Sequence, residues 1–219
     1  MTKKRCGSGL LPYPELIDEF LDTICSTIHL RLSVKVRLGL SSKDEISAVL
    51  PILNRYPLEH VTIHPRLASQ MYDGTVNLDA FDACQGLCTH KLIYNGDLFT
   101  PADFTHVSER FPDVDHWMFG RGLFANPFLL EEICSGQPTA AAEKATRLKA
   151  FHDGLMSGYA ERLSGEAHLI KRMCSHWDYL QGLLPDGPKA YRRFRKAKSL
   201  PAYQQAVADA LAHLSVFHG

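Results

Sequence analysis

The sequence predicts an α/β protein in which strand–helix units are followed by an all-helical segment. Three observations predict this class. Short apolar runs, each too short for a helix, recur about every 30 residues and end in polar residues or glycine. Amphipathic helical patterns lie between these runs, which is typical of a parallel sheet. Beyond residue 138 no strand pattern is found, and the rest of the chain has helical periodicity.

The first part of the chain contains four strand–helix units. A glycine-rich loop at residues 7–12 leads into a helix at 14–28; it either offers N–H groups to a phosphate or is a flexible connection. Ser42 is a suitable N-cap for the next helix, and Thr100-Pro101 is typical of a helix start. Strands are expected at about 32–37, 60–64, 91–95 and 115–120, with helices at 44–54, 78–84, 101–110 and 126–133.

The pattern changes at Gly136-Gln137-Pro138, which is typical of a connection between domains. Three or four helices are expected after it, including 141–163, 168–180 and 201–217. The predicted domains are therefore residues 1–136 and 137–219.

Composition narrows the class of protein. Lysine and arginine balance aspartate and glutamate, and 45% of the residues are hydrophobic, so the overall charge does not indicate nucleic acid. No apolar run approaches the length of a membrane span, and the amino terminus lacks the apolar core of a signal peptide, so a cytoplasmic location is expected. Cys84 and Cys88 form half of a zinc-ligand pattern, but no second pair accompanies them, which favours buried thiols and no metal site.

Polar side chains follow the four predicted strands where each strand ends. Because the carboxyl ends of parallel strands meet at one edge of a sheet, these side chains are expected to gather there. Cations, an imidazole and amides suit an anionic, planar, hydrogen-bonding ligand. The residues concerned are Lys35, Arg37, His64, Arg66, Asn95, Asp97 and Arg121.

The carboxyl-terminal region is locally basic. Residues 168–198 hold eight lysines and arginines against two aspartates, a local excess of six positive charges. Such a run of cations either binds a polyanion or forms a solvated helix face. Tyr191 and Phe194 either stack on nucleic-acid bases or pack their helix against the rest of the protein. The cations selected as candidates are Arg172, Arg192, Arg193 and Arg195.

Four features, in one order, carry a resemblance to a known family. They are Val34-Lys35-Val36-Arg37, then His64-x-Arg66 with Gln70-x-Tyr72-x-Gly74, then Asn95-Gly96-Asp97, then Gly120-Arg121-Gly122 with Asn126-Pro127. Together they resemble the tRNA-dihydrouridine synthase family, flavin enzymes that reduce uridine to 5,6-dihydrouridine in tRNA. The resemblance spans essentially the whole chain.

The resemblance implies a partial (β/α)8 TIM barrel of about four strand–helix units, followed by an all-helical domain. The family's Asn-x-Gly-Cys-Pro motif, which carries the general acid, does not occur in these 219 residues, and Cys6 lies in a different context. Pro65 stands where the family usually has glycine. The expectation is the carboxyl-terminal portion of such an enzyme, with little or no activity and a tendency to self-associate through the open half-barrel. A separate alternative is a truncated gene product or a mis-assigned start.

The resemblance also implies roles for individual residues. The cofactor is FMN, with NADPH or NADH as reductant; no Gly-x-Gly-x-x-Gly fingerprint is present. Arg37 and Arg66 would contact flavin, the substrate uridine or an intrachain carboxylate. The four candidate arginines of the basic region at residues 168–198, called the basic tail, would bind tRNA. Lys35 and His64 would contact the isoalloxazine ring, while the phosphate and ribityl chain would be held by Asn95, Gly96, Asp97, Gly120 and Arg121.

Two other functions stay open at this point. One is a non-catalytic tRNA-binding remnant in which only the basic tail is still functional and binds tRNA. The other is a small-molecule FMN oxidoreductase of barrel fold, which would bind flavin but not tRNA.

Overall fold

The computed structural model of the chain describes residues 5–216, which form two compact units. The first unit comprises the described residues up to 98 together with 105–120, and the second comprises 99–104 and the described residues from 121 onward. Each unit has its own hydrophobic core.

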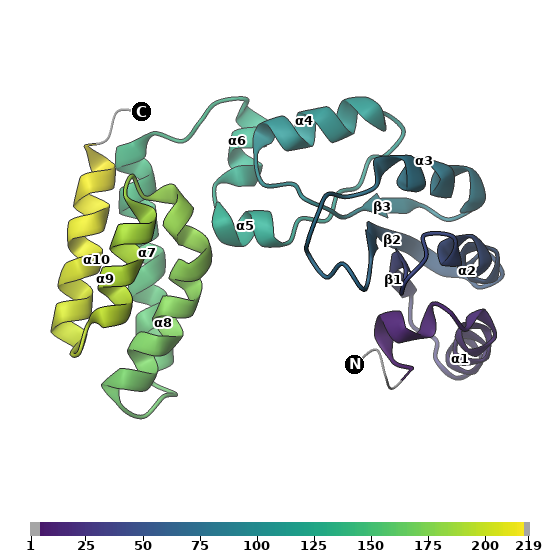
Figure 1. The fold of residues 1–219 in the computed structure, drawn as a ribbon, viewed down its shortest axis with the longest axis horizontal. Helices are drawn as coiled ribbons and strands as arrows, with labels where there is room; N and C mark the ends of the chain where they lie inside the picture. Colours follow the sequence, from purple (N-terminus) through teal and green to yellow (C-terminus); the bar gives the residue numbers. More distant parts are fainter. Residues whose placement is uncertain (1–4, 217–219) are drawn as a thin grey trace. The chain divides into compact units, whose positions relative to one another are not determined.

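The first unit contains a three-stranded parallel sheet. Its strands are β1 (Leu32–Gly39), β2 (Leu58–Leu67) and β3 (Leu92–Tyr94), in the order β1-β2-β3. A 3-10 turn at Gly7–Leu10 and α1 (Pro14–Thr27) precede the sheet. The strands are followed in turn by α2 (Glu45–Leu53), α3 (Leu78–Leu87) and α4 (Pro101–Arg110), as Figure 1 shows. The predicted α/β class is confirmed.

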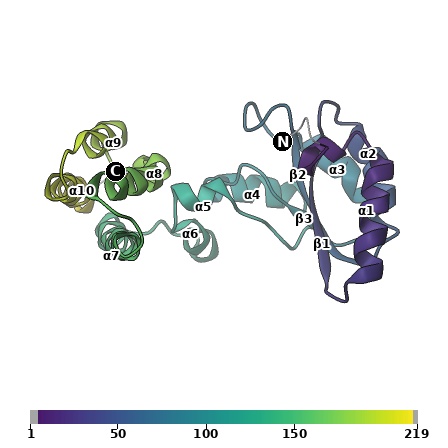
Figure 2. The ribbon, with the colours of Figure 1, turned by 90° about the horizontal axis from the view of Figure 1, so that it is seen from below.

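One face of this sheet is apolar because alternate strand residues point to opposite sides. Val36 and Ile63 project into a core that also holds Leu50, Phe81 and Tyr94. Helices α1, α2 and α3 lie along this face (Figure 2). The opposite face carries the polar residues of the same strands.

The predicted fourth strand at residues 115–120 is wrong. Within the described residues, that segment forms a single parallel bridge, between Trp117 and Tyr94. Tyr94 donates its N–H to the His116 carbonyl (3.3 Å) and accepts from Met118 N–H (2.8 Å). Among the described residues, this pairing does not extend into a strand.

Several helix and strand ends also differ from the predictions. Helix α3 extends three residues beyond the predicted end at Cys84, and β2 extends the predicted strand at both ends. A short helix, α5 (Arg121–Ala125), was not predicted, and α6 (Leu129–Ser135) begins three residues later than expected.

The second unit is built from helices. In addition to α5 and α6 it contains α7 (Ala141–Ala160), α8 (Glu166–Leu180), α9 (Gly187–Lys196) and α10 (Leu200–Ser215). Figure 2 shows these last four nearly end-on, around a core that contains Trp177, Phe194 and Tyr203. The helix predicted at 201–217 ends at Ser215, and Phe217 lies outside the described residues.

The compact second unit begins before the predicted boundary at residues 136–137. Helix α5 packs against α8, and Phe128 lies in the core of the helical unit. The functional division into residues 1–136 and 137–219 stays a prediction. Among the described residues, no helix has both the length and the apolar character needed to cross a membrane.

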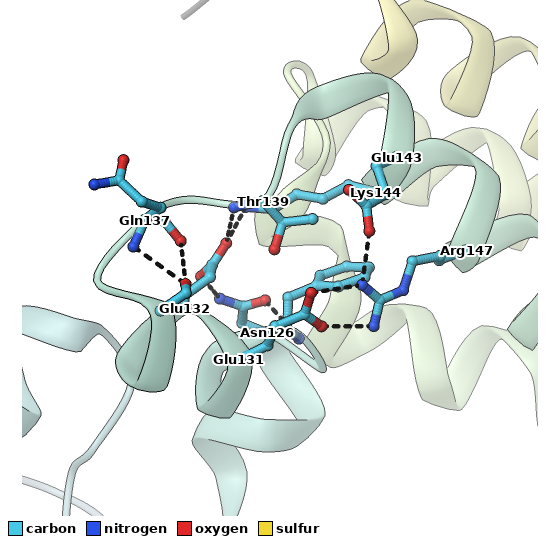
Figure 3. A network of polar contacts seen from close by, with 10 residues as sticks. Asn126, Glu131, Glu132, Gln137, Thr139, Glu143, Lys144 and Arg147 are labelled. Carbon is cyan, nitrogen blue, oxygen red and sulfur yellow. Dashed lines mark hydrogen bonds and ion pairs between the residues drawn. The ribbon is translucent and has the colours of Figure 1, made fainter.

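A buried carboxylate joins α6 to α7 (Figure 3). Glu132, 6% exposed, accepts from Lys144 Nζ (2.8 Å) and Thr139 N–H (3.0 Å) on one oxygen, and from Asn126 Nδ2 (2.8 Å) on the other. Burial alone would raise the pKa of Glu132, but these three donors outweigh it and lower the pKa. Glu131, by contrast, meets Arg147 at the surface.

We predict that Glu132→Gln lowers the free energy of unfolding by about 1–3 kcal/mol, because a buried charge-assisted network loses its anion. Urea denaturation measures this value. The matched control is Glu131→Gln, whose exposed pair is worth at most about 1 kcal/mol. Equal losses in the two variants would contradict the importance of the buried network.

Candidate functional site

The polar face of the sheet is set by the register of β1 and β2. Lys35 pairs with Thr62, and Arg37 pairs with His64. Because paired residues on neighbouring strands project to the same side, these four side chains share one face, opposite the apolar core. A row of cations and an imidazole therefore lies on the strand segments that lead to the carboxyl edge.

Lys35 is a cation inside an apolar strand. Its side chain is exposed, and it forms no salt bridge with any of the residues that the structure describes. Partial loss of hydration, reinforced by the charge of Arg37, lowers the pKa of its ammonium group. This position suits an anionic or electron-rich ligand atom.

His64 is 7% exposed, and its pKa is lowered to about 4. Burial is the main cause; the positive charges of Arg37, Lys35 and Arg66 add to it, and Asp97 opposes it. The imidazole is therefore neutral at pH 7, with one nitrogen able to donate a hydrogen bond and the other able to accept one.

Arg37 and Tyr72 adjoin this imidazole. Arg37 Nη1 donates to the Leu67 carbonyl (2.7 Å), and its Cζ atom lies 5.6 Å from the centroid of the Tyr72 ring. The Tyr72 ring centroid is 6.4 Å from that of His64. No role was predicted for Tyr72, although it belongs to the Gln70-x-Tyr72-x-Gly74 pattern.

Arg66, on the same strand as His64, is buried. Its side chain is 2% exposed, and its two Nη atoms donate to Asp97 Oδ1 and Oδ2, each at 2.6 Å. The Gly74 carbonyl accepts from Nη2 as well. Nε makes no hydrogen bond to any part of the chain between residues 5 and 216.

The turn after β3 carries Asn95-Gly96-Asp97. Asn95 Nδ2 donates to the Met118 carbonyl (2.6 Å), so this side-chain amide links the turn to the segment around Trp117 that pairs with Tyr94. A Cβ atom on Gly96 would lie 2.8 Å from Val76 Cγ1, so a larger residue there would force the Val76 side chain to shift. A Cβ atom on Gly120 would meet nothing within 4 Å.

Arg121 belongs to the second unit, where its guanidinium lies 5.2 Å from the centroid of the Phe99 ring. The four basic-tail arginines also lie in this unit, and all are exposed. Arg193 pairs with Asp209 (2.8 Å), and Arg172 and Arg195 lie over the rings of Tyr159 and Tyr191, respectively. They lie on α8 and α9.

The cysteine pair does not extend to a metal-ligand set. No group of three or more histidine, cysteine, aspartate or glutamate side chains placed to hold a metal occurs among residues 5–216. Burial raises the pKa of Cys84 to about 12, so this thiol stays protonated.

Cations, an imidazole and an amide lie near the carboxyl ends of the parallel strands, and a helical unit follows the sheet. The chain is therefore an α/β protein with a polar site at one edge of its sheet. The chain belongs to the dihydrouridine synthase (Dus) family, whose model matches residues 1–215.

Curated relatives agree with this assignment. The tRNA-dihydrouridine synthase B of Pasteurella multocida is 28% identical over 131 residues, which is 59% of this chain and 39% of the relative. That of Vibrio cholerae is 25% identical over 134 residues, 61% of this chain and 41% of the relative. That of Klebsiella pneumoniae is 24% identical over 193 residues, 85% of this chain and 59% of the relative. The chain thus spans only part of the length of these relatives.

We predict that neutral His64 makes folding pH-dependent. Its folded pKa of about 4 lies below the usual 6.5, so its contribution is complete above pH 6.5 and declines as the pH falls toward 4. Between pH 7 and pH 5, His64→Gln should lose about 2 kcal/mol less unfolding free energy than the wild type. Urea denaturation at the two pH values measures the difference.

The control for this experiment is His106→Gln, because His106 is exposed on α4. That variant should keep the pH profile of the wild type. A wild-type profile in His64→Gln would show that the imidazole is not held neutral by the fold.

Proposed function

We propose that this chain is part of an FMN-dependent oxidoreductase that reduces uridine to 5,6-dihydrouridine in tRNA, with NADPH or NADH as reductant and a cytoplasmic location. The observation that carries the proposal is the family match over residues 1–215. It is supported by the polar face of the sheet, where Lys35, Arg37 and His64 lie together.

In this proposal, residues 1–136 contribute half of a flavin-binding (β/α)8 barrel, and residues 137–219 form a helical tRNA-binding domain. Two observations support the barrel proposal. Three parallel strands alternate with helices, and a bridge at Trp117 lies where a fourth strand would be. Strand β1 is at an edge of the sheet, since β2 is its partner among the described residues. An open edge of this kind favours self-association.

The residues on the polar face fit a flavin. Lys35 offers a positive charge without a carboxylate partner among the described residues, and neutral His64 offers a hydrogen bond. A bound flavin supplies hydride to the substrate ring. The turn Asn95-Gly96-Asp97 lies at the same edge, but Asn95 Nδ2 donates to the Met118 carbonyl and both carboxylate oxygens of Asp97 accept from Arg66. The proposed role of this turn, and that of Gly120 and Arg121, in holding the phosphate and ribityl chain therefore rests on the sequence resemblance.

Turnover by these 219 residues alone is expected to be very low. The family's Asn-x-Gly-Cys-Pro motif is not among them, so no side chain here is assigned the task of protonating the substrate carbon. The chain's own residues would bind and orient the ligands. Lys35 and His64 would contact the flavin ring, and Arg37 would contact the flavin or the uridine.

We predict that FMN added to the purified chain binds, and that Lys35→Ala weakens this binding by about 10- to 100-fold, because the variant lacks a charge-assisted hydrogen bond to the ligand. Quenching of flavin fluorescence measures the affinity. The matched control is Lys91→Ala, an exposed lysine that pairs with Asp115 (3.2 Å) before β3 begins. Equal FMN affinity of Lys35→Ala and the wild type would show that Lys35 does not contribute to FMN binding.

The helical unit is proposed to contact tRNA through Arg172, Arg192, Arg193 and Arg195. Their exposure on α8 and α9 supports this role, since phosphate neutralisation needs accessible cations. The same observation favours a second candidate function, a non-catalytic tRNA-binding protein. Binding of tRNA by a chain that fails to bind FMN would favour this second function.

We predict that Arg192→Ala combined with Arg195→Ala weakens tRNA binding and lowers the slope of log affinity against log salt by about one for each phosphate that is no longer neutralised. Filter binding at several salt concentrations measures the slope. The control variant, Arg31→Ala with Arg55→Ala, removes two exposed arginines of the first unit and should leave the slope unchanged. An unaltered slope in the α9 variant would contradict a tRNA surface there.

A further inference from the structure

The guanidinium of Arg66 is enclosed by its own chain rather than offered to a ligand. It is 2% exposed, and both Nη atoms are used by the carboxylate of Asp97 at 2.6 Å. Burying an arginine is costly unless it is paired and hydrogen-bonded, and here the pairing is bidentate. A molecule at the surface would have to displace Asp97 to reach this group.

The two partners of Arg66 come from different loops. Asp97 lies in the turn after β3, whereas Gly74, whose carbonyl also accepts from Nη2, lies in the loop between β2 and α3. Both have left-handed backbones, with φ of 41° at Asp97 and 68° at Gly74. A left-handed aspartate is uncommon and is maintained by its surroundings, which here include the bidentate ion pair.

The loop held in this way carries Tyr72. Two further bonds shape the loop: Leu67 N–H donates to Gln70 Oε1, and Asp73 N–H donates to the Gln70 carbonyl, both at 2.8 Å. Tyr72 is 54% exposed and lies beside His64 and Arg37. An exposed aromatic ring on a braced loop is preorganised to cover one side of a planar ligand.

We infer that Arg66 is a positioning residue that joins Asp97 to the Gly74 carbonyl, and so holds Tyr72 at the polar face of the sheet as the aromatic wall of the ligand site. This rests on the proposed function only in taking that face to be the flavin site. Arg66 acts through its two loops, and Tyr72 is the residue that meets the planar ring.

The test compares Arg66→Lys and Asp97→Asn with the wild type by amide hydrogen exchange, without any ligand. Lysine keeps the charge but cannot bridge two carboxylate oxygens and a carbonyl. The amides of Asp73 and Asn77, which bond to Gln70 and Pro65, should exchange at least about tenfold faster in both variants, since only the loop is released. The Val61 amide, bonded to Lys91 in the sheet, should accelerate clearly less than the two loop amides.

A second measurement uses added FMN as the probe. Arg66→Lys and Tyr72→Ala should each weaken FMN binding by about tenfold, and the double variant should bind no more weakly than Tyr72→Ala, because both changes remove the same wall. Arg55→Lys, at a surface pair with Asp18, is the matched control and should change neither measurement.

The outcomes separate the two ideas. Unchanged loop exchange in both Arg66→Lys and Asp97→Asn would overturn the positioning role, whatever happens to FMN. Equal acceleration at Val61 would also overturn it, because that result means general destabilisation. Faster loop exchange in the two variants, together with a wild-type chain that fails to bind FMN, would support the positioning role and overturn the proposed function.

Discussion

The parallel register of β1 and β2 is the constraint on which the candidate site depends. Pairing Lys35 with Thr62 and Arg37 with His64 puts two cations and a neutral imidazole on one face, while the intervening Val36 and Ile63 pack into the core. A shift of one residue would turn the cations into the apolar core. The same alternation that makes the sheet stable therefore also assembles its polar face.

Buried polar groups are matched to specific partners in both units. In the first, Arg66 meets both oxygens of Asp97, and in the second, Glu132 is surrounded by three donors. His152 lies between Tyr203 and Asp153, and burial lowers the pKa of its ring. Such networks are costly to disrupt when one member is removed, which makes them effective at fixing loops and helix junctions.

Local patterns in the sequence were sufficient for much of the fold. Apolar periodicity predicts α1 and β1, and Thr100-Pro101 predicts the start of α4, because these elements are specified by neighbouring residues. The fourth strand was wrong because the apolar run at 115–120 pairs with β3 only at Tyr94, and the extent of pairing between distant segments is a tertiary property. Family resemblance placed the chain correctly, and the family match confirms it.

The site was less predictable because its contacts are non-local. An intrachain carboxylate was one of the contacts considered for Arg66, but Asp97 is 31 residues away, and nothing near either residue in the sequence identifies it as the partner. Tyr72 was visible only as part of a motif, since its closeness to His64 depends on how the loop folds back. In the sequence, Gly96 suggests a position where a ligand comes close to the backbone, yet close packing against Val76 also favours glycine there.

The most direct test of the central claim is an NMR titration of the labelled chain with FMN, in which amide and side-chain shifts locate the contact surface. The account predicts saturable changes at Lys35, Arg37, His64 and Tyr72 and in the turn at Asn95, with the outward-facing helices unaffected. Changes confined to α1, α2 and α3, or none at the polar face of the sheet, would contradict it.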